Sequence, residues 1–329
     1  MAVTSSEAPV RDSLAVLPTP VTETPRLADL LGLRGTLLVK RDDLTGFAVG
    51  GNKARPLEPI IAAARAAGST VLVTGGTAGS NFCQAATAAA AWAGMDCTLV
   101  LAGDPSRHPN LAAALAWGAS VVWTGDPDRK SVDVGIVEVA DTLRTQGQRP
   151  YECPRGGATS LGATGFHHAA LELAAQLSDR VAGEVEVVVG TGSGGTLAGL
   201  VSGTVALGRP WHVTGASVSR APTETAARVH ALSIGTAALL GTPAPSTADV
   251  DLVDARGPGH GVASTEGARA AELALRASGL VLDPVYSAKA LGAVPQILGD
   301  RRDDPDLTTI FWHTGGLLDA VAEWEHREP

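Results

Sequence analysis

The sequence contains few cysteines, lysines and aromatic residues, and no long apolar run. Its 329 residues include three cysteines (Cys83, Cys97 and Cys153), whose spacing fits neither a C-x-x-C pair nor a zinc-ligand set. We therefore expect no metal, and an odd number of scattered cysteines is typical of a reducing compartment such as the cytoplasm. No stretch is apolar enough to span a bilayer, and the first eleven residues lack the apolar core of a signal peptide. A membrane partner is not expected.

Basic residues are also scarce. The chain has 25 lysines and arginines against 34 aspartates and glutamates, which gives a formal net charge of −9. Because no cluster of basic residues rises above this acidic background, the sequence offers no face that could follow a phosphate backbone. Nucleic acid is therefore not an expected partner.

Strand-like runs alternate with helical patterns along the chain. The runs lie at 36–40, 70–74, 97–101, 120–123, 185–189, 211–217 and 309–312, and the helical patterns at 57–67, 80–93, 110–117, 132–144, 165–177, 197–206 and 265–277. The runs are nearly continuous in valine, isoleucine and leucine, as in strands that helices cover on both faces. This alternation predicts an α/β fold of two open, mostly parallel twisted sheets flanked by helices.

Two stretches rich in glycine and proline, 47–51 and 148–157, mark domain boundaries. The segment between them has strands and helices of its own. We therefore predict a small α/β domain over 48–157, inserted into a larger cofactor-binding domain formed by 1–47 and 158–329.

A glycine-rich loop at 190–196 (Gly-Thr-Gly-Ser-Gly-Gly-Thr) connects a predicted strand to a predicted helix. Glycines let a ligand approach the backbone, and amides at a helix N-terminus bind anions, so the loop suits a phosphate group. Gly190, Gly192 and Gly195 also match the G-x-G-x-x-G pattern of dinucleotide sites, but such a site needs an acidic residue about 20 positions later, and 196–223 contains none. A tight turn without a ligand is the alternative, although a turn does not need so many glycines.

Lysine occurs only four times, at Lys40, Lys53, Lys130 and Lys289. Lys53 follows Gly-Gly-Asn and opens a helical segment in an apolar chain. Burial lowers the pKa of an amine, and the neutral amine is the form that makes a Schiff base with a carbonyl cofactor. The alternative for Lys53 is a solvated surface lysine.

A phosphate loop and a Schiff-base lysine together suggest pyridoxal phosphate, and five motifs in order support this cofactor. Arg-Asp-Asp-Leu-Thr-Gly at 41–46 with Gly-Gly-Asn-Lys at 50–53 resembles the lysine motif of the fold-type-II pyridoxal-phosphate enzymes, in the branch of 1-aminocyclopropane-1-carboxylate deaminase and D-cysteine desulfhydrase. The segments 75–81, 154–165, 282–286 and 311–316 are similar to that family's Gln-Ser-Asn, Pro-x-Gly-Gly, Asp-Pro-Val-Tyr and His-Thr-Gly-Gly elements. The resemblance covers nearly the whole chain and implies a homodimer that binds a small amino acid.

The resemblance implies a role in cofactor binding for each matching residue. Lys53 forms the Schiff base with pyridoxal 5′-phosphate and moves the α-proton of the substrate, and Asn81 binds the phenolic oxygen. The phosphate is held by Gly192, Ser193, Gly194, Gly195 and Thr196. Thr314 faces the pyridine nitrogen, where a hydroxyl makes the ring a weaker electron sink than a carboxylate would and so favours β-elimination.

On the substrate side, the resemblance implies that Ser80 contacts the carboxylate or relays a proton. It also implies that Asn81 and Tyr286 stand beside the substrate. A Ser-Asn pair is often only a helix cap, and Tyr286 could be a packing aromatic, so these two alternatives stay open.

Five positions distinguish this chain within the family. Ser287 and Thr314 match the desulfhydrases, whereas deaminases that open a cyclopropane ring carry glutamate and leucine there. Gly79, Phe82 and His260 fit neither group, and we expect all three to line the substrate side of the cofactor. Gly79 and Phe82 are expected to make the pocket roomier and less polar. His260 is either a catalytic acid or base that titrates near neutrality or a hydrogen-bonding spectator.

These residues predict a pyridoxal-phosphate-dependent lyase that catalyses α,β-elimination on a small β-substituted amino acid, releasing a keto acid and ammonia as D-cysteine desulfhydrase does. Three alternatives stay open at this point. They are a β-replacement synthase, a ring-opening deaminase, and a pyridoxal-phosphate-binding protein that has lost turnover.

Overall fold

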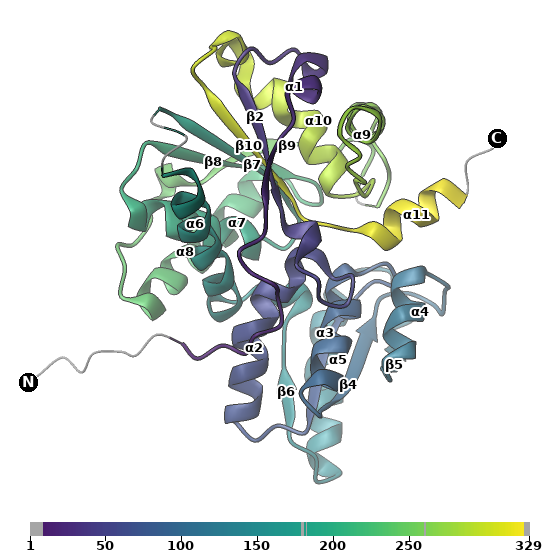
Figure 1. Ribbon diagram of the computed structural model, residues 1–329. Coiled ribbons are helices and arrows are strands. Elements are labelled where there is room, and N and C mark those ends of the chain that lie inside the picture. Colours follow the sequence, from purple (N-terminus) through teal and green to yellow (C-terminus); the bar gives the residue numbers. More distant parts are fainter. Residues whose placement is uncertain (1–8, 179–180, 182, 260, 326–329) are drawn as a thin grey trace, which may run out of the picture.

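The computed structural model describes residues 9–178, 181, 183–259 and 261–325 and contains two sheets (Figure 1). The larger sheet has the strand order β1 (Val21–Glu23), β2 (Thr36–Arg41), β10 (Thr308–His313), β7 (Val185–Thr191), β8 (Trp211–Ser217) and β9 (Asp251–Asp254). The smaller sheet has the order β5 (Ser120–Trp123), β4 (Asp96–Leu101), β3 (Val71–Gly76) and β6 (Pro150–Glu152). Neighbouring strands are parallel except for the β1–β2 edge pair, so the predicted α/β fold with two mostly parallel sheets is confirmed.

Helices cover both faces of each sheet. On the larger sheet, α6 (Ser160–Leu177), α7 (Gly195–Leu207) and α8 (Pro222–Leu240) pack on one face, and α1 (Pro25–Leu31), α9 (Thr265–Ser278) and α10 (Ser287–Leu298) pack on the other. On the smaller sheet, α2 (Ala54–Ala66), α3 (Asn81–Trp92) and α4 (Pro109–Ala116) lie opposite α5 (Lys130–Thr145). Short 3-10 helices lie at η1 (Asp42–Leu44), η2 (Gly51–Lys53), η3 (Arg155–Gly157), η4 (Thr247–Asp249) and η5 (Gly299–Asp303).

The sequence of β7 shows why this layering forms. Val185, Val187 and Val189 pack into the core beside α6, α7 and α8, whereas Val188 points to the opposite face and packs into the core beside α9 and α10. Successive strand residues point to opposite faces, so a strand that carries valines on both faces must be covered on both sides. Burying both faces of the sheet supplies most of the apolar area that stabilises the larger half of the molecule.

Each predicted strand and helix is present, but several elements were not predicted. The missed strands β1, β6 and β9 are three or four residues long and lie at the sheet edges, where they are only partly buried. Among the missed helices, α10 contains a proline, and the alanine and threonine residues of α8 give a weak apolar pattern. The edge strands carry too few apolar residues to show a period, so the sequence signal was absent there.

The strands of the two sheets come from different parts of the chain. All strands of the smaller sheet lie between residues 71 and 152, inside the segment 48–157. Helix α2 packs against both α6 and α3 and so belongs to both halves, and the exact boundary stays a prediction.

The last helix, α11 (Leu317–Glu325), leaves β10 and reaches α4 of the smaller half (Figure 1). Within the described ranges, no helix has the length and apolar character that crossing a membrane requires.

A buried ion network joins the two halves. Asp42, at the end of β2, accepts hydrogen bonds from Nε and Nη2 of Arg55 at 2.8 and 2.7 Å and from Nε1 of Trp312 at 2.8 Å. Arg55 also donates to Glu172 of α6 at 3.0 Å, and Lys40 forms an ion pair with the same carboxylate. Although burial alone would raise the pKa of Asp42, the Arg55 guanidinium holds it below its usual value. The network is therefore ionised, and each charge has a partner.

We predict that Asp42→Ala lowers the free energy of unfolding by about 3–5 kcal/mol, because it leaves the buried Arg55 guanidinium without its bidentate partner. Urea unfolding measures the change. Glu272→Ala, which breaks an exposed ion pair with Arg276, is the control and should cost no more than about 1 kcal/mol. Equal effects of the two substitutions would contradict a structural role for the network.

Candidate active site

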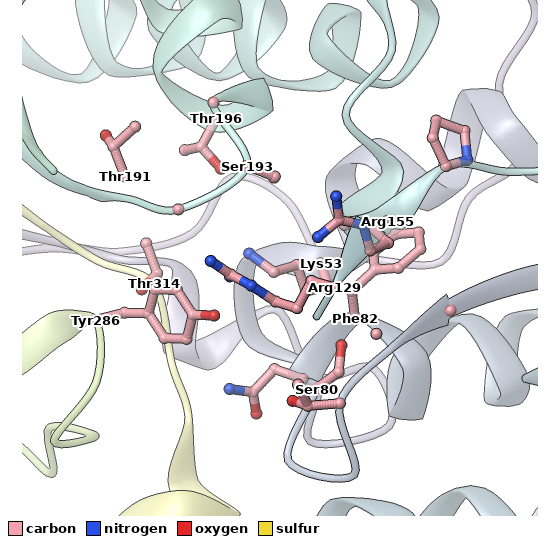
Figure 2. Close-up of a pocket in the computed structure, with 18 of the residues that line it drawn as sticks. Lys53, Ser80, Phe82, Arg129, Arg155, Thr191, Ser193, Thr196, Tyr286 and Thr314 are labelled. Carbon is pink, nitrogen blue, oxygen red and sulfur yellow. The ribbon is translucent and has the colours of Figure 1, made fainter. Parts of the chain in front are cut away.

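A cavity of about 410 Å³ lies between the two halves, at the carboxyl ends of β3 and β7. Its wall includes residues of both sheets, and Figure 2 shows several of them pointing inward. Ligands of α/β proteins bind at this end of parallel strands, because the loops that follow the strands converge there. Within the residues that the structure describes, no group of histidine, cysteine, aspartate or glutamate could hold a metal ion.

Lys53 ends η2 and directly precedes α2, and its side chain lines the cavity. Burial lowers the pKa of its amine from 10.5 to about 8, an effect that Asp283 and Asp42 partly oppose. The Nζ atom donates a hydrogen bond to Oδ1 of Asn52 at 2.9 Å. A substantial fraction of the amine is therefore neutral near pH 8, as nucleophilic attack on a carbonyl requires.

The backbone around Lys53 is fixed against the end of β10. Gly51 has φ +55°, and a β carbon there would lie 2.3 Å from the carbonyl oxygen of Thr314. The amide of Asn52 donates to the same oxygen at 3.0 Å. The Gly-Gly-Asn-Lys motif thus has glycine where the two chain segments touch, and this contact brings Lys53 and Thr314 to one cavity.

The glycine-rich loop forms the wall of the cavity that belongs to the larger half. A β carbon on Gly192 would lie 2.9 Å from Cε1 of Tyr286, and Gly194 has φ +94°, so side chains are excluded at both positions. Helix α7 begins at Gly195, and its first amides have no partner within the helix. Thr196 Oγ1 accepts a hydrogen bond from Asn52 Nδ2 at 3.2 Å, which ties the loop to the lysine segment.

Two arginines donate hydrogen bonds to backbone carbonyl oxygens of this loop. Arg220 Nη1 donates to the carbonyl oxygen of Gly192 at 3.0 Å, and Arg228 Nε donates to that of Ser193 at 2.8 Å. These bonds direct the loop carbonyls outward and place two positive charges beside the loop. The arrangement fits a phosphate dianion, which backbone amides and nearby guanidinium groups stabilise together. Sequence reasoning missed these arginines, because they lie in later segments without a motif.

Ser80, Asn81 and Phe82 lie where α3 begins, on the wall opposite the loop. Ser80 Oγ accepts a hydrogen bond from the amide of Cys83 at 3.2 Å, so its side chain does cap the helix. It also lines the cavity, and the capping role therefore does not exclude contact with a ligand. The N-terminal end of α3 carries a partial positive charge that suits a carboxylate.

Asp319 of α11 holds Asn81 from the other half of the molecule. Its carboxylate accepts hydrogen bonds from Nδ2 of Asn81 at 2.7 Å and from Nδ2 of Asn110 at 2.8 Å. Burial, together with the nearby Asp283, raises the pKa of Asp319 to about 7, and the hydrogen bonds from Asn81 and Asn110 oppose this rise only in part. Sequence reasoning missed this residue, since nothing local distinguishes it from a surface aspartate on an amphipathic helix.

Asp283 fixes the backbone at Tyr286 and lies against Gly316, the second glycine after Thr314. Its carboxylate accepts from the amides of Val285, Tyr286 and Ser287 at 3.0, 2.6 and 2.9 Å, which fixes the turn into α10. A β carbon on Gly316 would lie 2.6 Å from Cβ of Asp283, so the Asp-Pro-Val-Tyr and Gly-Gly elements fit each other directly. Burial raises the pKa of Tyr286 to about 12, so the hydroxyl stays protonated and acts as a hydrogen-bond donor.

Gly79, Phe82 and His260 are the positions that we expected to change the substrate side of the pocket. Phe82 is buried in the cavity wall, where its ring packs on Gly157. A β carbon on Gly79 would lie 2.9 Å from Nε2 of His108, so the histidine ring fills the space that we expected to be open. The expectation of a roomier pocket at Gly79 is therefore corrected. His260 lies outside the described residues.

A search of protein-family models matches residues 13–315 to a family described as pyridoxal-phosphate dependent enzyme. Proteins named D-cysteine desulfhydrase from Salmonella schwarzengrund and Salmonella paratyphi B are each 36% identical to the chain over 320 residues, which cover 94% of the chain and 94% of each relative. The similarity therefore extends through both halves of the molecule.

The chain is also similar to solved structures over most of its length. A structure described as an ACC deaminase homologue aligns with a TM-score of 0.87 at 30% identity, covering 94% of this chain and 93% of that one. A fungal L-serine ammonia-lyase from Rhizomucor miehei and a pyridoxal 5′-phosphate-dependent aspartate racemase align with TM-scores of 0.68 and 0.66 at 17% and 19% identity, over 95% and 91% of this chain and 98% and 90% of theirs. The last two similarities concern the fold alone.

The raised pKa of Asp319 gives a prediction about stability and pH. Between its unfolded value near 3.8 and about 7, the folded protein binds more protons at this carboxyl than the unfolded chain, so its contribution to stability decreases as the pH rises through this range. We therefore expect Asp319→Asn to be more destabilising at pH 5 than at pH 8, as measured by urea unfolding at both values. Asp104→Asn, at an exposed position, should show the same change at both pH values. A pH-independent effect of Asp319→Asn would contradict the raised pKa.

Proposed function

Because the chain belongs to the family of pyridoxal-phosphate dependent enzymes, we propose that Lys53 binds this cofactor covalently and that a small β-substituted amino acid, of which D-cysteine is the first to test, is the substrate. The enzyme is a pyridoxal-phosphate-dependent lyase that catalyses α,β-elimination. The observation that carries the assignment of Lys53 is its position: an amine with a pKa lowered to about 8, facing a phosphate-binding glycine loop across one cavity.

The cavity residues fit the cofactor on three sides. Gly192, Ser193, Gly194, Gly195 and Thr196 bind the phosphate, with Arg220 and Arg228 as the supporting charges. When bound, pyridoxal phosphate withdraws electrons from the α-carbon of an attached amino acid, which makes the α-proton acidic.

Two further residues position the ring of the cofactor. Asn81, which Asp319 fixes, would donate to the phenolic oxygen, and Thr314 would offer a neutral hydroxyl to the ring nitrogen. The hydroxyl cannot hold a proton on that nitrogen as a carboxylate would. A weaker electron sink favours a reaction in which the leaving group takes the electrons.

Lys53 also moves the proton. With the cofactor and substrate bound, the Lys53 amine would take the α-proton, because a base with a pKa of about 8 is matched to proton transfer near neutral pH. Ser80 and the first amides of α3 bind the substrate carboxylate, and Tyr286 donates a hydrogen bond beside the substrate. The family resemblance supports a contact between His260 and the substrate, in which His260 is an acid, a base or a hydrogen-bonding residue.

Two positions favour elimination over ring-opening deamination. Ser287 is buried, and its hydroxyl donates to Asp283 and to the carbonyl of Gly315, so no glutamate faces the substrate from this position. Thr314 stands where the ring-opening enzymes resembled above carry leucine. Both features favour the desulfhydrase-like reaction.

We further propose that the enzyme is a homodimer in the cytoplasm and that residues 48–157 form the inserted domain. The family resemblance supports the dimer. The three cysteines are all free and buried, as expected in a reducing compartment. Light scattering of the purified protein tests the dimer.

The reaction is tested with the holoenzyme and D-cysteine, with both enantiomers of β-chloroalanine as general elimination substrates. We expect keto acid and ammonia in equal amounts, with sulfide from D-cysteine. Incorporation of an added thiol into an amino-acid product would instead indicate β-replacement. Absence of keto acid from every substrate would contradict elimination.

We predict that Lys53→Ala abolishes both covalent cofactor attachment and turnover, because the chain then has no amine at this position. Borohydride reduction followed by peptide mass analysis measures the attachment. Lys130→Ala, at an exposed position, should retain both properties. Covalent attachment that survives in Lys53→Ala would contradict the assignment.

The lowered pKa of Lys53 predicts the pH dependence of cofactor capture by the apoprotein. The neutral fraction of the amine rises about tenfold per pH unit below its pKa. The capture rate, followed by the change in cofactor absorbance, should therefore rise from pH 6 to 8 and level off above the pKa of about 8. A rate that keeps rising tenfold per unit to pH 10 would indicate an ordinary exposed lysine.

A further inference from the structure

Arg129 places a positive charge in the wall of the cavity. It directly precedes α5, its side chain is half-buried, and it points into the cavity toward Tyr286 (Figure 2). Its guanidinium makes no hydrogen bond or ion pair with any residue that the structure describes. Tyr286 cannot neutralise it, because the pKa of about 12 keeps that hydroxyl protonated. A half-buried guanidinium in a cavity wall, without an acceptor among the described residues, can donate to an anionic group of a bound ligand.

The three other arginines of the cavity wall have partners. Arg155 forms a bidentate pair with Asp133 at 2.7 and 2.6 Å. Arg220 and Arg228 brace the glycine loop, and Arg220 also pairs with Glu224 at 3.1 Å.

These charges act on Arg129. Burial and repulsion by Arg220 and Arg155 lower its pKa, and Tyr286 and Asp128 oppose this effect only in part. Arg129 therefore sits in a positive field within a chain whose formal net charge is −9, and a bound anion would relieve this repulsion.

The anionic groups of the proposed reaction do not account for Arg129. The cofactor phosphate lies against the glycine loop of the larger half, where Arg220 and Arg228 serve it. The substrate carboxylate lies at the start of α3, beside Ser80. Arg129 comes from a different segment, the loop between β5 and α5, and so can contact a third anionic group.

We propose that the preferred substrate carries a negatively charged β-substituent, such as a sulfate or phosphate ester, and that Arg129 binds this group. This inference rests on the proposed elimination. In the reaction, the Cα–H bond breaks and its proton passes to Lys53, a carbon–carbon double bond forms, and the Cβ–O bond breaks. The ester oxygen keeps the bonding electron pair and leaves as inorganic sulfate or phosphate. The released enamine takes up a proton and reacts with water to give the keto acid and ammonia.

The test compares the holoenzyme on O-sulfoserine and O-phosphoserine with the neutral analogue O-acetylserine, in both configurations. We expect kcat/KM to be at least about tenfold higher for a charged ester than for the neutral one, because a charge-assisted hydrogen bond contributes that much or more. Arg129→Gln should lower kcat/KM for the charged esters by about 10- to 100-fold, mainly through KM, and leave O-acetylserine nearly unchanged. Lys130→Gln removes a positive charge one position away on the exposed side and should change neither.

Three results would overturn the proposal, each in a different way. Equal losses for charged and neutral esters would assign Arg129 to the substrate carboxylate. Weaker binding of pyridoxal phosphate with unchanged substrate preference would assign it to the cofactor phosphate. No preference for charged esters in the unmodified enzyme would remove the role of Arg129 in specificity.

A binding measurement separates this inference from the proposed reaction. The amino acid 2-amino-3-phosphonopropionate has a charged β-group that cannot be eliminated, and alanine is its neutral counterpart. Titrating the cofactor absorbance with each should show tighter binding of the phosphonate by about tenfold or more, lost in Arg129→Gln and kept in Lys130→Gln. This preference can be present even if no substrate is eliminated, whereas elimination without the preference would overturn only the role of Arg129.

Discussion

The buried carboxylate of Asp42 is the constraint on which the active site depends. It binds Arg55, which lies two residues after Lys53, and it binds Trp312, which lies two residues before Thr314. One carboxylate therefore fixes the segment that carries the amine and the segment that faces it across the cofactor site. Because both bonds are buried, small shifts would leave a charge without a partner, and this cost keeps the geometry rigid.

A second link crosses between the two halves. Asp319, on the helix after β10, holds Asn81 at the start of α3, so a residue assigned to the cofactor depends on the chain's last helix. Positive charge is also divided between the halves, with Arg220 and Arg228 on one side and Arg129 on the other. The cavity is therefore completed only when both halves meet, as in other α/β enzymes whose ligands lie where loops from several strands converge.

Some parts of the structure could be predicted from the sequence and others could not. The central strands could be predicted because burial on both faces favours nearly continuous apolar runs, such as Val187, Val188 and Val189 in β7. The short edge strands could not, since partial exposure permits polar residues and removes the pattern. At the site, motifs identified Lys53 and the glycine loop, but His108 in the space beside Gly79 could not be foreseen, because no local pattern places a distant ring over a glycine.

The sequence alone determined the α/β class and the two mostly parallel sheets, since both depend on local apolar periodicity. Its five-motif resemblance to the fold-type-II enzymes indicated the cofactor and the lysine that we assign to it. Tertiary structure alone decided which charges meet. Asp42 joins Arg55 and Trp312, Asp319 joins Asn81, and Arg129 lines the cavity without a hydrogen bond or ion pair to any residue that the structure describes. Electrostatic interactions depend on distance in space and on burial, and neither quantity can be obtained from the order of residues along the chain.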